Sequence, residues 1–98
     1  MKREREDMMM TEAHLILHPI RFRLLQLLSE RQMYVSELSK ALAEERRLLS
    51  YHLDILEQYG FVQSKHEISD QPRSKGKALR IYWATAKIEQ VLGELKKL

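Results

Sequence analysis

Hydrophobic positions recur with helical spacing through the first third of the chain. Residues 8–17 are apolar and compatible with a helix, which should end at His18 because a residue before proline is pushed out of the helical region. Pro19 suits the first turn of a second helix, where its missing N–H is not needed. The apolar stripe from Ile20 predicts that this second helix runs to about residue 30.

A short extended stretch and two more helices are predicted next. Residues 33–35 favour a strand, and Ser36 can cap a brief helix that ends near Ala43. A longer helix is predicted over residues 45–59, and Gly60 should end it in a left-handed conformation. The apolar positions of the longer helix, at helical spacing, are Leu48, Leu49, Leu53, Ile55 and Leu56.

After Gly60 the pattern changes to that of strands. Residues 61–65 and 81–85 favour strands, and the polar, glycine-containing segment between them predicts a β-hairpin with a long tip. A final helix is predicted from Ala86 by apolar residues at i, i+3, i+4 and i+7. Gly93 weakens it by about 1 kcal/mol relative to alanine.

This order of elements predicts an α+β, mostly α fold. We expect a winged helix-turn-helix with a two-stranded β-hairpin wing and extra N- and C-terminal helices. The length of 98 residues suits a single domain, residues 1–98. Its predicted parts are a helix-turn-helix at 36–59, a wing at 61–85, and dimerisation helices at 1–17 and 86–98.

Composition excludes several classes of protein. The chain is 44% hydrophobic, which is too apolar for a disordered protein. It has no cysteine, so it has no disulfide scaffold, thiolate zinc site, iron–sulfur cluster or cysteine nucleophile. No apolar run approaches the roughly 18–20 residues of a membrane span, and residues 1–10 lack the features of a signal peptide. We therefore expect a cytoplasmic protein with no membrane partner.

The net charge of +3 is unevenly distributed. Residues 46–80 carry seven basic and four acidic side chains, which equals the whole surplus. A local basic field of this kind indicates a polyanionic partner better than the total charge does.

The start of the predicted 45–59 helix combines basic and polar side chains. Arg46 and Ser50, and Arg47 and Tyr51, lie one turn apart on the face away from the core. A helix in the major groove reads bases mostly with its N-terminal residues, and arginine can bond guanine through two hydrogen bonds. The alternative is an ordinary solvated face, but the basic hairpin that follows favours DNA binding.

The predicted wing supplies the second group of cations. Arg73, Lys75 and Lys77 lie at its tip, where flexible cations suit phosphate contacts or the minor groove. We predict that residues 66–79 lie on the DNA backbone or in the minor groove. The alternative is a solvated turn.

The terminal helices carry apolar stripes beyond what a winged-helix core needs. Packed across a two-fold axis, they would form a homodimer with two reading helices about one DNA turn apart. The alternative is that they pack on each other within one chain, and both arrangements can hold together. The predicted interface residues are Met9, Leu15, Ile16, Ile88, Val91, Leu92 and Leu95.

Metal binding and catalysis find little support. His14 and His18 have the spacing of two ligands on a helix, but Pro19 interrupts that helix and only Glu12 offers a third ligand nearby. No glycine-rich phosphate loop, nucleophile elbow or catalytic carboxylate pair is present. We expect no metal, no cofactor and no enzymatic activity.

Three segments resemble the ArsR-type winged helix repressors. They are residues 18–28 (HPIRFRLLQLL), 35–42 (VSELSKAL) and 49–62 (LSYHLDILEQYGFV). The resemblance implies a homodimeric, DNA-binding transcriptional regulator with reading positions at Arg46, Arg47, Ser50 and Tyr51 and a wing at 73–77.

The chain departs from that family at two places. Residues 43–45 are Ala-Glu-Glu where the family has Gly-Leu-Ser, so the capping serine is missing and two carboxylates approach the DNA side. The family's metal sensors use cysteines in the third or fourth helix, or carboxylate–histidine sets in the last helix, whereas this chain has no cysteine and its last helix has no histidine. Metal sensing therefore does not carry over from the resemblance.

The sequence thus predicts a homodimeric regulator of double-stranded DNA, and we expect a repressor, with residues 45–59 in the major groove. One alternative is a winged helix used only for protein contact, which Glu44 and Glu45 favour. Another is a metal or ligand sensor within the DNA-binding class. The effector, if there is one, stays unknown.

Overall fold

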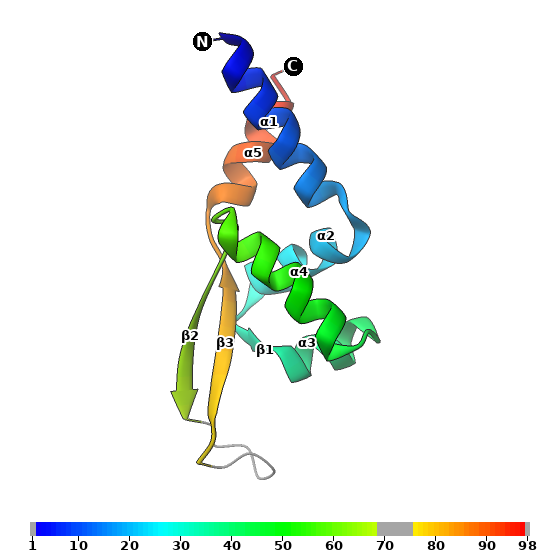
Figure 1. Ribbon diagram of the computed structural model, residues 1–98, viewed down its shortest axis with the longest axis vertical. Coiled ribbons are helices and arrows are strands. Elements are labelled where there is room, and N and C mark those ends of the chain that lie inside the picture. The colour runs from blue at the N-terminus through cyan, green and yellow to red at the C-terminus, as the bar shows by residue number, and fades with distance from the viewer. Residues whose placement is uncertain (1, 69–75, 98) are drawn as a thin grey trace.

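The computed structural model describes residues 2–68 and 76–97. They form a winged helix-turn-helix that is mostly helical, as predicted (Figure 1). The helices and strands are α1 (Lys2–Leu17), α2 (Pro19–Glu30), β1 (Met33–Tyr34), α3 (Val35–Leu42), α4 (Arg46–Gln58), β2 (Val62–Ile68), β3 (Ala78–Ala84) and α5 (Lys87–Leu95). α1 and α5 lie together at one end of the molecule, and the β2–β3 hairpin extends from the opposite end.

Local side-chain bonds stabilise the starts of α2 and α3. His18 is extended, as expected before proline, and its Nδ1 accepts the Ile20 N–H at 3.2 Å to cap α2. The prediction that Ser36 caps α3 is wrong: the helix already begins at Val35, and Tyr34 is its N-cap residue. There the Glu37 carboxylate accepts the Tyr34 backbone N–H at 2.9 Å, the reciprocal half of a capping box.

The ends of α3 and α4 both use left-handed residues. Ala43 has a φ of 53° and turns the chain from α3 toward α4, which begins at Arg46 with Glu45 as N-cap. Gly60 has a φ of 83°, which confirms the predicted left-handed end of α4. The Phe61 N–H then donates to the Leu56 carbonyl at 2.9 Å and directs the chain into β2.

A three-stranded antiparallel sheet underlies the wing, in the order β1-β3-β2. β2 pairs with β3 along its whole length, from Val62 opposite Ala84 to Ile68 opposite Ala78. The short strand β1 adds to the other edge of β3, with Met33 opposite Tyr82. The hairpin is therefore attached to the body of the domain through β3.

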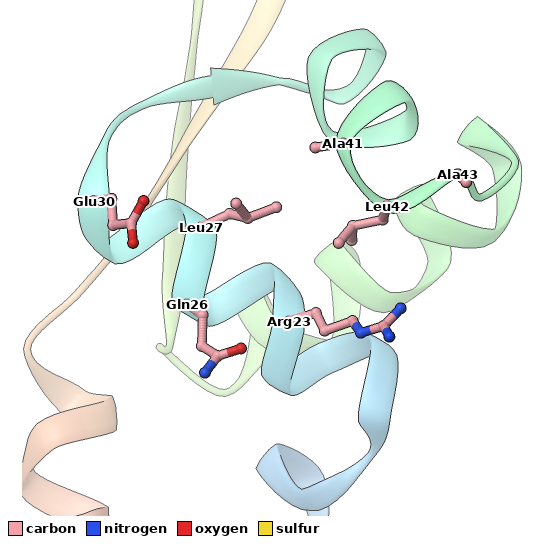
Figure 2. Close-up of a pocket in the computed structure, with 7 residues that line it drawn as sticks. All are labelled: Arg23, Gln26, Leu27, Glu30, Ala41, Leu42 and Ala43. Carbon is pink, nitrogen blue, oxygen red and sulfur yellow. The ribbon is translucent and has the colours of Figure 1, made fainter.

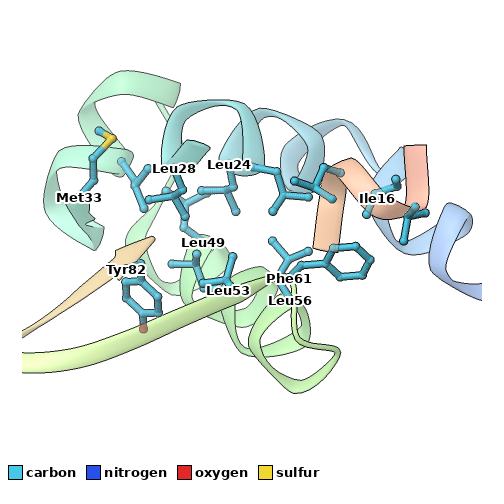
Figure 3. Packing of buried hydrophobic residues seen from close by; sticks show 14 residues of the cluster. Ile16, Leu24, Leu28, Met33, Leu49, Leu53, Leu56, Phe61 and Tyr82 are labelled. Carbon is cyan, nitrogen blue, oxygen red and sulfur yellow. The ribbon is translucent and has the colours of Figure 1, made fainter. Parts of the chain in front are cut away.

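The core lies between α2, α4, the inner sheet face and the α1–α5 pair (Figure 3). The leucine stripe of α2 meets that of α4, and Phe61 closes the core near α5. Leu48, one of the apolar positions of α4, is 36% exposed. The fully buried members include Ile16, Leu24, Leu25, Met33, Leu38, Leu49, Leu53, Leu56, Phe61 and Val62.

Candidate nucleic-acid interface

The turn between α3 and α4 is held by Ser39. Its hydroxyl donates to the Glu44 carbonyl at 2.6 Å, and its own carbonyl accepts the Glu44 N–H at 3.2 Å. Two bonds to one residue fix the direction in which α4 leaves the turn. The helix-turn-helix geometry is thus set without the glycine that the resemblance leads one to expect at Ala43.

The N-terminus of α4 lacks a side-chain cap. Glu45 occupies the N-cap position but its carboxylate accepts no bond from the helix. The first N–H groups of α4 therefore keep free hydrogen-bonding capacity, and the positive end of the helix dipole lies there. This end can meet a phosphate, although the carboxylates of Glu44 and Glu45 lie beside it.

α4 has a clear division between a buried and an exposed face. Leu49, Leu53 and Leu56 point into the core. Arg46, Arg47 and Tyr51 are exposed, and Ser50 is half-buried. The structure therefore brings the four predicted reading residues onto the first turns of one helix. Leu48 also lies on this surface. The spacing of apolar residues along the helix does not by itself distinguish it from the core leucines.

The two arginines of this face have no acidic partner among the described residues. Within residues 2–68 and 76–97, the ion pairs join Arg31 to Glu37 and Lys87 to Glu12. Neither Arg46 nor Arg47 takes part, so both guanidinium groups remain available to an external anion.

The middle of α4 is tied to α2 through a buried histidine. His52 is 3% exposed, and its Nδ1 accepts a hydrogen bond from Arg21 Nε at 3.0 Å. The His18 ring lies 4.6 Å away, centroid to centroid, and the Tyr51 ring meets His52 edge-on at 5.1 Å. Burial, with His18 and Arg21 adding positive charge, lowers the pKa of His52 below its ordinary value of 6.5. Sequence reasoning did not find this cluster, whose hydrogen bond joins residues 31 positions apart.

The wing is tied to α4 and to the start of α3. The Ser64 hydroxyl donates to the Glu57 carboxylate at 2.9 Å, which joins β2 to the last turn of α4. The Tyr34 hydroxyl donates to the carboxylate of Glu67, also on β2. These bonds fix the orientation of the hairpin relative to the exposed face of α4.

The cations of the wing are only partly described. Lys65, Lys77 and Arg80 are exposed on the hairpin. The predicted contact residues Arg73 and Lys75 lie outside the described residues. The hairpin and the exposed face of α4 thus both carry unburied positive side chains.

The apolar stripes of the two terminal helices meet within one chain. Ile16, Ile88 and Val91 are buried in the core of the single chain, so these predicted interface residues are not free to face a partner. Leu15, Leu92 and Leu95 are half-buried against the same core. The side chain of Met9 lies outside the described residues. Apolar side chains that do remain exposed on α1 are Met8, Met10 and Leu17.

An open pocket of about 510 Å³ lies between α2 and the end of α3 (Figure 2). Leu27 and Leu42 in its lining are half-buried, while Arg23, Gln26 and Glu30 are exposed. It holds no buried charged group that could select a ligand. The lining residues are Arg23, Gln26, Leu27, Glu30, Ala41, Leu42 and Ala43.

The described residues offer no obvious metal site. No group of three or more His, Cys, Asp or Glu side chains comes together among them. Of the candidate pair, His14 is exposed on α1, whereas His18 Nδ1 already accepts the Ile20 N–H. In the same part of the chain no helix is long and apolar enough to cross a membrane.

The chain is similar to known helix-turn-helix proteins in sequence and in fold. Residues 16–64 match the helix-turn-helix domain family, whereas no curated protein matches the chain. A transcriptional regulator homologue from Pyrococcus horikoshii OT3 is 22% identical, covers 99% of this chain and 93% of its own, and has a TM-score of 0.69. Reduced HlyU from Vibrio cholerae is 19% identical over 98% of this chain and 94% of its own, with a TM-score of 0.73.

A third solved structure, a possible transcriptional regulator for arsenical resistance, is 25% identical over 86% of this chain and 78% of its own, with a TM-score of 0.66. The family match spans half of the chain and includes α2, α3 and α4. The chain therefore belongs to the helix-turn-helix domain family, and its winged fold is shared with these solved structures.

Proposed function

We propose that the protein is a sequence-specific, double-stranded DNA-binding transcriptional regulator that acts as a homodimeric repressor of the ArsR type. α4 enters the major groove, and the β2–β3 hairpin lies on the backbone or in the minor groove. The observation that carries the proposal is the exposed face of α4, where Arg46 and Arg47 lie near Tyr51 and form no ion pair with the acidic side chains of residues 2–68 and 76–97. The cytoplasmic location expected from the sequence belongs to the same proposal.

Each part of the interface has a physical role. The arginines of α4 bond guanine edges or phosphates, while Ser50 and Tyr51 bond bases or phosphates. Lys65, Lys77 and Arg80 neutralise phosphates and give affinity with little sequence information. The similar structures include a transcriptional regulator homologue and a possible transcriptional regulator for arsenical resistance, which supports a regulator of this kind.

Selection of bound duplexes from a random pool, followed by titration of the best sequence, tests this function. Arg46→Ala and Arg47→Ala should each lower the affinity by about 1–3 kcal/mol and relax the sequence preference. Arg23→Ala, an exposed arginine on α2 that has no part in the proposed interface, is the matched control and should leave binding unchanged. Unchanged affinity in both arginine variants would contradict the assignment of α4 as the reading helix.

The dimer part of the proposal rests on the apolar side chains that α1 leaves exposed. Met8 is 64% exposed and borders an open pocket of about 270 Å³ formed by α1, Tyr59 and Lys87. A second copy packed there would remove these surfaces from water and set the spacing of the two α4 helices. Sedimentation equilibrium should show a dimer that Met8→Glu weakens, while Ile68→Glu, equally exposed but on the wing, leaves it intact.

A second candidate function is protein contact without duplex binding. The carboxylates of Glu44 and Glu45 beside the start of α4 favour it, because they repel phosphate. A gel shift against random duplex at low salt separates the two functions. A retarded complex supports DNA binding, and its absence supports the protein-contact function.

A further inference from the structure

The exposed face of α4 contains a leucine among its polar reading residues. Leu48 is 36% exposed and Tyr51 is 59% exposed, and they are i and i+3 neighbours on the first turns of the helix. Tyr51 is steadied by its edge-on contact with the buried His52 ring. Together Leu48 and Tyr51 form a small apolar patch in the part of α4 that reads bases.

The charge around this patch indicates what covers it. Arg46 and Arg47 precede Leu48 directly in the helix, are exposed, and have no acidic partner in the described part of the chain. Two free cations beside an apolar patch suit a surface that presents an apolar group between rows of anions. The major groove of DNA has this character where a thymine 5-methyl group projects between the phosphate backbones.

We infer that Leu48, steadied by Tyr51, is a specificity-determining residue that packs on a thymine 5-methyl group in the major groove. This inference rests on the proposed function and adds one element of the recognised sequence. Cytosine has only a hydrogen where thymine has its 5-methyl group, and it presents an N4 amino donor at the neighbouring position, with which leucine cannot form a hydrogen bond. Covering that donor without a partner is unfavourable, and the site therefore prefers thymine to cytosine.

Replacing thymine by deoxyuridine tests the contact, because it removes only the methyl group and keeps the base pair. In the best duplex selected from a random pool, each thymine is replaced in turn, and affinity is measured by fluorescence anisotropy. At least one position in each half-site should show about a fourfold loss with the wild-type protein, the effect expected for one buried methyl group.

Two variants assign that loss to Leu48. In Leu48→Ala, thymine and deoxyuridine at that position should bind equally well. Gln26→Ala is the control, since Gln26 is exposed on α2 and outside both the proposed DNA interface and the proposed dimer surface, and it should keep the fourfold difference. Circular dichroism of both variants confirms that the fold is retained.

The outcomes separate this inference from the function on which it rests. If no duplex is bound, both are overturned. If the wild-type protein binds a selected duplex but is indifferent to deoxyuridine at every position, the Leu48 contact alone is overturned. The same holds if Leu48→Ala keeps the methyl dependence.

Discussion

Acidification should destabilise the protein through His52. The folded chain uses the Nδ1 atom of this buried side chain as an acceptor for Arg21 Nε, so that nitrogen must be unprotonated. A proton on it would abolish the bond and place a second positive charge 3.0 Å from the guanidinium. His18, packed against the same ring, adds to this repulsion when charged.

The sign and size of the effect follow from linkage. The pKa of His52 in the folded chain lies below 6.5, its ordinary value, which we take for the unfolded chain. Between these two pKa values the unfolded chain binds a proton that the folded chain does not. The free energy of unfolding is therefore fully retained above about pH 6.5, and falls below it by up to about 1.4 kcal/mol per pH unit until the folded pKa is reached.

Urea denaturation followed by circular dichroism, at pH 7.5, 6.5 and 5.5, measures this loss in a range above the ordinary carboxyl pKa values. In His52→Asn the amide oxygen can accept from Arg21 without titrating, so the variant should lose less stability on acidification than the wild type. His66→Asn, an exposed histidine on β2, is the control and should retain the wild-type pH dependence. Equal losses in the wild type and His52→Asn would refute the reasoning.

Three further changes test other parts of the fold and site. Ala43→Gly should raise the free energy of unfolding by about 0.5–1 kcal/mol, because it relieves a left-handed alanine whose cost exceeds the added freedom of the unfolded chain; a lower value in urea denaturation would contradict this. Leu53→Ala should lower the free energy of unfolding by about 2–5 kcal/mol through the cavity it leaves in the core, and a loss under 1 kcal/mol would show that the site collapses around it. Lys77→Ala should reduce the slope of log affinity against log salt by about one unit and keep the sequence preference, whereas an unchanged slope would remove Lys77 from the phosphate contacts.

The parts of the fold that are local in sequence could be predicted from it. The period of the leucines located α2 and α4, and Gly60 marked the end of α4 because a positive φ suits glycine. The cap of α3 was misassigned because Glu37 satisfies the N–H of Tyr34 and the helix begins one residue before Ser36. Such competition between neighbouring polar side chains is decided by geometry that a sequence pattern does not contain.

Contacts between distant residues could not be predicted in the same way. An apolar stripe shows that a helix needs a partner surface but not which one, so the stripes of α1 and α5 suited either a second chain or each other. The burial of Ile16 and Val91 shows that the apolar stripes of α1 and α5 pack against each other within one chain. Leu48 illustrates the same limit, since its place beside the leucine stripe of α4 resembles a core position until the neighbouring helices are located.

The structure couples the exposed face of α4 to the helices proposed for dimerisation. The Thr85 hydroxyl donates to the Gly60 carbonyl at 2.6 Å, and Lys87 Nζ donates to the Tyr59 carbonyl while pairing with Glu12 of α1 at 3.0 Å. The C-terminus of α4 is thus bonded to the α1–α5 pair, and its middle is bonded to α2 through Arg21. A helix held in this way cannot change its angle to the DNA alone, because any shift of α1 against α5 moves it as well. A second chain packed on α1 would therefore adjust both the spacing and the tilt of the two reading helices.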